Sequence, residues 1–187
     1  MEQSVLAQFQ TVGSDLFHRG LLSSHSGNLS IRKGERVLIT RHGCMLGHLY
    51  EDDVVEVELT ADSEGDILAS IDLVVHRAIY RLTSAQAIVH AHPTHAIALS
   101  LTNEEILPVD VEGEVLLKKV PVVGGEKSVG PGEGAEVIAR ALQEYYAVLA
   151  RGHGCFTVGK SLEEACHFAI TVEESSRILY LLKALSS

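Results

Sequence analysis

The segment IVHAHPTH, residues 88–95, places three imidazoles within eight residues at the end of an apolar run. Successive side chains of a strand point to opposite faces, so His90 and His92 would project from the same face. Two neutral imidazoles at that spacing can chelate a divalent metal ion. The alternative is an exposed pair on an edge strand. The apolar residues 87–89 instead indicate a buried strand, where unpaired imidazoles would be costly, so the spacing favours a metal site.

A catalytic metal site needs a third protein ligand and one open coordination position. His153, in the segment RGHGC, is the best candidate because it lies between two glycines, where the backbone can turn sharply and present a side chain. His95 follows Pro93 and is expected on the next helix, where a structural role or a place beside the ligands suits it better. The predicted ligands are therefore His90, His92 and His153, without His95.

Proton transfer beside such an ion requires a base, and Asp72 is the candidate. We expect it in the first turn of a helix capped by Ser70, with His76 four residues later on the same helix face. A carboxylate there is often only a favourable helix start, so its role depends on how near it lies to the metal site. In the loop SSHSGN, Gly27 and Asn28 either present a backbone N–H and an amide to an anion or only form a turn.

These side chains are carried by alternating helices and strands. Hydrophobic periodicity and capping residues predict helices at about residues 3–20, 70–82, 94–101, 133–145 and 161–185, and strands at 29–32, 36–40, 53–59, 87–92 and 146–154. Ser161 and Glu164 form a capping box that opens the last helix. The glycine-rich segment 108–134 is predicted to be poorly suited to form a core of its own. Within it, GGEKSVGPGEG is predicted to be a mobile or interface loop.

Composition limits the partners. The 187 residues are 46% hydrophobic without a low-complexity tract, which predicts one domain spanning 1–187. The 25 acidic and 15 basic residues give a formal charge of −10, and no Lys/Arg cluster stands out, which argues against nucleic acid or an anionic membrane. Neither a membrane-length apolar stretch nor a signal peptide is apparent, so we expect a cytoplasmic protein with a small-molecule substrate. Its cysteines, Cys44, Cys155 and Cys166, are expected to be free buried thiols.

The order of these motifs is more specific than any one of them. GNLSIR at 27–32, ITRHG at 39–43, a carboxylate four residues before a histidine, the HAH strand and a late HG turn together resemble the class II aldolase/adducin family, whose members include fuculose-phosphate aldolase and ribulose-phosphate 4-epimerase. The resemblance covers about residues 3–185. It implies an α/β class, three-layer α/β/α fold with a mostly antiparallel central sheet, usually assembled as a homotetramer.

The resemblance also implies site residues. His90, His92 and His153 match the ligands of Zn²⁺, or of another divalent ion such as Mn²⁺, Co²⁺ or Ni²⁺, and the catalytic carboxylate falls on Asp72. The phosphate-binding residues of the family fall on Gly27, Asn28, His42, Gly43, Ser70 and Ile71. The chain departs from the family where Asp72 replaces a glutamate and where His42 and Ile71 replace a threonine and a second serine.

The implied activity is that of a metal-dependent lyase. Such an enzyme cleaves a small, phosphorylated hydroxy-ketone or sugar phosphate through an enediolate that the metal stabilises while the carboxylate moves a proton. Epimerisation, dehydration and decarboxylation can use the same intermediate and stay open as alternatives. A non-catalytic, adducin-like binding protein is the alternative of a different class, and the three histidines together with an acid favour the enzyme.

Overall fold

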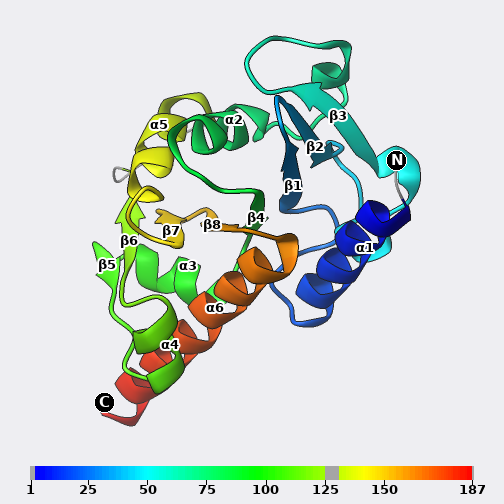
Figure 1. Cartoon of the computed structure of the whole chain (residues 1–187). Helices are drawn as coiled ribbons and strands as arrows, with labels where there is room; N and C mark the ends of the chain where they lie inside the picture. The colour runs from blue at the N-terminus through cyan, green and yellow to red at the C-terminus, as the bar shows by residue number, and fades with distance from the viewer. Residues whose placement is uncertain (1–2, 125–130, 187) are drawn as a thin grey trace.

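The computed structural model describes residues 3–124 and 131–186, in which a sheet lies between two layers of helices (Figure 1). The strands are β1 (Asn28–Lys33), β2 (Arg36–Thr40), β3 (Val54–Glu58), β4 (Ala87–Ala91), β5 (Glu105–Ile106), β6 (Val120–Val123), β7 (Ala147–Ala150) and β8 (Gly154–Gly159). They form an eight-stranded sheet in the order β3-β2-β1-β4-β8-β7-β6-β5. Of the neighbouring pairs, β6 and β7 are parallel and the others antiparallel.

Helices cover both faces of this sheet. They are α1 (Gln3–His18), α2 (Leu73–Leu82), α3 (Thr94–Ser100), α4 (Val111–Leu116), α5 (Pro131–Ala141) and α6 (Leu162–Leu185), with short 3-10 turns at Leu46–His48, Glu51–Asp53 and Glu64–Ile67. Figure 1 shows α2 and α5 on one face, and α1, α3 and α6 on the other. The predicted three-layer fold with a mostly antiparallel sheet is thereby confirmed. Among the described residues, no helix is long and apolar enough to cross a membrane.

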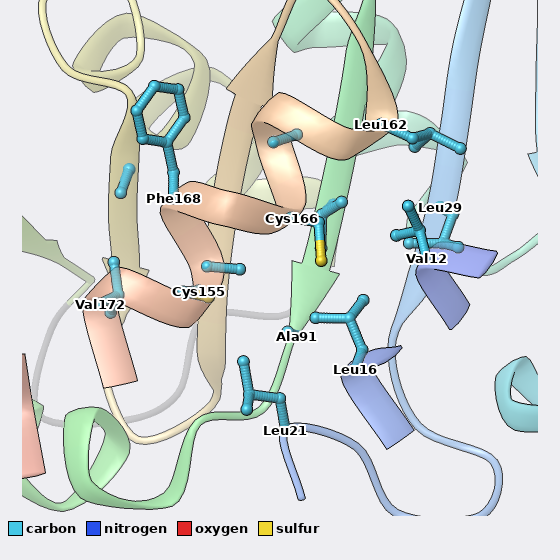
Figure 2. Close-up of a cluster of buried hydrophobic side chains, with 14 of the residues drawn as sticks. Val12, Leu16, Leu21, Leu29, Ala91, Cys155, Leu162, Cys166, Phe168 and Val172 are labelled. Atoms are coloured by element: carbon cyan, nitrogen blue, oxygen red, sulfur yellow. The ribbon is translucent and has the colours of Figure 1, made fainter. Parts of the chain in front are cut away.

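Two hydrophobic cores follow from the alternation of side chains along the strands. In β4, Val89 belongs to the core under α1 and α6, and its neighbour Ile88 belongs to the core under α2 and α5. Figure 2 shows the first core, where Leu16 of α1 and Phe168 of α6 lie over the sheet. Burying each such side chain contributes about 1.5–3 kcal/mol. His90 follows Val89 and therefore faces the second layer, toward α2.

Several local predictions are confirmed. The hairpin β1–β2 turns at Gly34, whose φ of 64° lies in the left-handed region that favours glycine. Ser161 caps α6, because its Oγ accepts a hydrogen bond from the Glu164 N–H at 3.2 Å. The three cysteines are free; Cys155 and Cys166 are buried, and Cys44 is half-buried.

The predicted start of the helix at Ser70 is wrong. The helix begins at Leu73, and Asp72 occupies the N-cap position without a side-chain capping bond. Ser70 instead donates its N–H to Thr40 O at 3.1 Å, and the bridge between Arg41 and Ala69 continues this pairing. Its backbone is thus held against the end of β2. The Ser70 Oγ accepts from the Asp72 N–H at 3.3 Å.

One further expectation needs correction. The single strand predicted at 146–154 ends at Ala150, and after a tight turn at residues 151–153 a second strand that was not predicted, β8, pairs antiparallel with β7. Within the segment 108–134, expected to be a poor independent core, residues 108–123 form α4 and β6, and Leu117 and Val120 are buried in the core shared with α6. Residues 125–130 of GGEKSVGPGEG lie outside the described residues, so the loop expected there is not described.

Candidate active site

The structure brings the three predicted histidine ligands together. His90 lies in β4, His92 directly follows this strand, and His153 lies in the turn between β7 and β8. The two Nε2 atoms of His90 and His92 are 3.0 Å apart. One ring nitrogen from each of the three residues lies within 4.8 Å of the others. His90 is buried, and His92 and His153 are half-buried, so the cluster opens toward solvent on one side.

Glycines allow this convergence. Gly152 has a φ of 68°, and the His153 N–H bonds to Ala150 O at 3.0 Å, which closes the turn that presents the imidazole. A Cβ atom on Gly154 would lie 2.5 Å from Ala91 O and 3.0 Å from ring atoms of both His90 and His92. The sequence indicated the turn, but the contact of Gly154 with the two imidazoles depends on the pairing of β4 with β8 and was missed.

The backbone fixes which nitrogen of His90 is free. Its Nδ1 lies 2.9 Å from Cys155 O, and a carbonyl oxygen only accepts, so Nδ1 carries the proton and the Nε2 lone pair faces the other histidines. The ring also stacks on Phe156 with centroids 4.0 Å apart. Burial, followed by the neighbouring His92 and His153, holds the pKa of His90 well below its ordinary value. Burial and His153 likewise lower the pKa of His92, and both shifts favour the neutral form that a metal ligand must have.

The donor set fits a divalent first-row metal ion. An ion 2.0–2.1 Å from two nitrogens at a tetrahedral angle separates them by about 3.3 Å. The 3.0 Å between the Nε2 atoms of His90 and His92 is close to that value. Neutral imidazoles suit zinc, cobalt, nickel or copper, and manganese less well. Three protein ligands with an open side is the arrangement of a catalytic rather than a structural site.

Asp72 lies beside this cluster. Its Oδ2 is 3.7 Å from His90 Nε2 and accepts a hydrogen bond from Asn28 Nδ2 at 2.7 Å. The side chain is buried, and it does not cap its own helix. The carboxylate is therefore directed at the histidines, the geometry that a proton-transfer residue next to a metal-bound substrate requires.

Gly27, Asn28 and Ser70 lie close to His90 or Asp72. Gly27 has a φ of 77°, and a Cβ atom there would lie 2.6 Å from His90 O. The start of β1 can therefore approach β4 this closely only with glycine at this position. The buried amide of Asn28 also accepts from His76 Nε2 at 2.6 Å. One N–H of that amide is committed to Asp72.

His42 and Gly43 lie in the exposed turn that follows β2. The His42 N–H donates to Leu68 O at 2.9 Å, and the Gly43 φ is 72°. Together with the pairing of Ser70 to Thr40, this bond places the turn beside the segment that leads into α2. Ile71 is 64% exposed in that segment, so it presents an apolar side chain where the family pattern has a serine.

His95 has a different environment. Its Nδ1 lies 2.7 Å from Glu173 Oε1, its backbone N–H bonds to the same carboxylate, and its ring lies against Tyr180. These contacts tie the start of α3 to α6. The role that they support for His95 is structural.

Fold and site together define a class of α/β protein in which three histidines and a fixed carboxylate converge at one end of a mostly antiparallel sheet. Residues 7–180 match the family described as Class II Aldolase and Adducin N-terminal domain, and the chain belongs to this family.

Relatives and solved structures agree with this assignment. The chain is 30% identical to an L-fuculose phosphate aldolase of Methanococcus maripaludis strain C7, over 91% of this chain and 93% of that protein. It is also 30% identical to a 3-oxo-tetronate 4-phosphate decarboxylase of Escherichia coli O6:H1, over 97% of this chain and 89% of that protein. The crystal structure of L-fuculose-1-phosphate aldolase from Thermus thermophilus superposes with a TM-score of 0.92 at 41% identity, covering 97% of this chain and 95% of that one.

Proposed function

We propose that the chain is a metal-dependent class II aldolase that cleaves a small phosphorylated hydroxy-ketone. His90, His92 and His153 hold the divalent ion, zinc being the first choice for three imidazoles. The relatives named above as aldolases support this reaction, and both those names and the decarboxylase name support a phosphorylated substrate. Residues 1–187 form a single domain in this proposal.

The observation that carries the proposal is the position of Asp72. Its Oδ2 lies 3.7 Å from the His90 nitrogen that would face the ion, and the Asn28 amide holds it there. A divalent ion, when bound, would polarise the substrate carbonyl and stabilise negative charge on the substrate oxygens. Asp72 would move the proton at the carbon next to that carbonyl. Gly27, Asn28, His42, Gly43 and Ser70 would surround the phosphate.

Decarboxylation is the second candidate, because a decarboxylase of the family is as similar to the chain as the archaeal aldolase. Loss of CO₂ from a 3-oxo acid leaves a similar charge next to a carbonyl, so the same three histidines would serve. The aspartate at position 72, one methylene shorter than the glutamate of the family pattern, changes the reach to the reacting carbon and can decide between the two reactions.

We also propose that the chain is a homotetramer with its active site near a subunit boundary. Large apolar side chains are exposed along α3 to α4 and on the last turns of α6, including Leu101, Leu107, Val109, Val111, Val115, Tyr180 and Leu185. Exposed apolar surface of this kind is typical of protein interfaces. Light scattering at micromolar concentration should give four chains per particle, and a stable monomer would contradict the proposal.

Two assays on one preparation test the reaction. Zinc-loaded protein is incubated with L-fuculose 1-phosphate, and the release of dihydroxyacetone phosphate is followed; in parallel, CO₂ release from 3-oxo-tetronate 4-phosphate is measured. The aldolase proposal expects the first product and little of the second. Release of CO₂ alone would support the decarboxylase, and neither product from metal-loaded protein would contradict the choice of substrates.

A further inference from the structure

A chain of buried hydrogen bonds runs from the core to the Asp72 carboxylate. On α2 and its N-cap, Asp72, His76 and Tyr80 recur every four residues and so share one helix face. On β1, Asn28 and Ser30 are two apart and share the face toward that helix. The two sets alternate: Tyr80 to Ser30 is 2.7 Å, Ser30 to His76 Nδ1 2.6 Å, His76 Nε2 to Asn28 2.6 Å and Asn28 to Asp72 2.7 Å.

The direction of the first bonds can be worked out from the carboxylate. A carboxylate oxygen accepts, so Asn28 turns its Nδ2 toward Asp72. The amide is planar, and its Oδ1 must then face His76. An amide oxygen also only accepts, so His76 carries a proton on Nε2.

The other half of the chain follows from the state of His76. This ring is fully buried, and burial lowers its pKa to about 3, so it is neutral at ordinary pH. A neutral ring with a proton on Nε2 has a bare Nδ1, which accepts from the Ser30 hydroxyl. Ser30 has one proton to give, so its oxygen accepts from Tyr80. Every bond in the chain therefore donates toward Asp72.

We propose that His76 is a positioning residue for Asp72: Ser30 and Tyr80 fix its tautomer, and it fixes the Asn28 amide that holds the carboxylate beside His90. This rests on the proposed function, because it assigns a role within the same proton transfer. All five residues are at most 5% exposed, so water cannot readily replace a lost partner. The orientation matters because a misplacement of about 1 Å at a catalytic group can reduce turnover a hundredfold.

Two substitutions of His76 separate positioning from packing. Gln keeps an N–H donor and an oxygen acceptor at the end of the side chain, whereas Leu fills a similar space with neither. His76→Leu should lower kcat by about 10- to 100-fold with a much smaller change in KM, as for removal of a group that orients an active-site residue. His76→Gln should recover most of that loss.

A neighbouring core residue provides the matched control. Ile79→Val also perturbs the buried face of α2, but its aliphatic side chain makes no hydrogen bond in the chain. It should lower the melting temperature and leave kcat unchanged. If His76→Leu loses no more activity than Ile79→Val, or if His76→Gln is as inactive as His76→Leu, the positioning role is wrong.

Nuclear magnetic resonance tests the inference without any turnover. In zinc-loaded protein labelled at histidine and asparagine, the ring of His76 should be neutral at pH 7 with its proton on Nε2, and the Asn28 amide protons should be shifted by their hydrogen bonds. His76→Leu should collapse the Asn28 shift, and His76→Gln should retain it.

The two readouts distinguish two failures. Intact resonances with no turnover of any substrate would contradict the proposed reaction and leave the hydrogen-bond chain standing. A His76 proton found on Nδ1, a charged ring at pH 7, or an Asn28 amide unaffected by His76→Leu would overturn the positioning role whatever the activity.

Discussion

Asn28 of β1 and His90 of β4 are directly opposite each other in the antiparallel ladder, so their side chains project to the same face of the sheet. His90 contributes a nitrogen to the three-histidine cluster, and Asn28 holds Asp72 against it. The register of two strands thereby sets the distance between the metal site and the carboxylate.

Asp72→Asn should keep the fold and the metal, because the amide is nearly the same shape and its oxygen can still accept from Asn28. Turnover should fall by about 10²–10⁴-fold, the usual effect of losing a general base. Steady-state kinetics with metal analysis of the same sample measures this, and the exposed Asp52→Asn is the control. If turnover is unchanged with metal bound, Asp72 does not transfer the proton and serves only at the start of the helix.

His92→Ala should abolish stoichiometric metal binding, since a half-buried ligand is removed from a set of three. His95→Ala should leave the metal content unchanged, because His95 bonds to Glu173 instead. Elemental analysis after dialysis compares the two variants. Equal metal content in wild type and His92→Ala would mean that the ion binds elsewhere.

Gly154→Ala should weaken metal binding by at least about tenfold, because the new Cβ would meet ring atoms of His90 and His92 at 3.0 Å. Gly34→Ala is the matched control: its φ of 64° imposes backbone strain of about 1–2 kcal/mol, but the space around it is open. Calorimetric titration with zinc should find the control unchanged. Unchanged affinity in Gly154→Ala would show that the imidazoles can move aside.

The metal-free protein should lose stability as the pH falls from about 6.5 toward 3. The pKa of His76 is about 3 in the folded state against an ordinary value of 6.5, so between these values the unfolded chain binds a proton that the folded one does not. Each such proton lowers the free energy of unfolding by about 1.4 kcal/mol per pH unit. Urea titrations at a series of pH values should show that the free energy of unfolding depends less steeply on pH in His76→Gln than in wild type, by about one proton. An equal slope in the two proteins would contradict a neutral His76.

The sequence predicted the histidine cluster because the alternation along a strand and the freedom of a glycine turn are local properties. Strand alternation was enough to predict His90 and His92, and the glycine turn was enough to predict His153. The start of α2 was misplaced because Ser70 is held by Thr40, thirty residues away, and no local pattern reveals that pairing. The pairing of β7 with β8 was missed for a related reason. The segment was interpreted as one strand, although the turn at His153 separates two short strands that pair with each other.

The hydrogen-bond chain shows the limit of sequence patterns more clearly. Asp72 and His76 are recognisable as neighbours on one helix face, and Asn28 and Ser30 as neighbours on one strand. Their alternation depends on how α2 crosses β1, a tertiary arrangement that neither local pattern encodes. The functional roles of the candidate site residues stay predictions until the variants are measured.

The most direct test is hydrogen exchange at the carbon next to the carbonyl of dihydroxyacetone phosphate, because it isolates proton transfer from the choice of aldehyde. In deuterated water, zinc-loaded protein should incorporate deuterium at that carbon, stripped protein should not, and added zinc should restore the exchange. Asp72→Asn should lose it with the ion still bound. Failure of zinc-loaded wild type to exchange, or equal exchange by stripped protein, would contradict a metal-dependent proton transfer at His90, His92, His153 and Asp72.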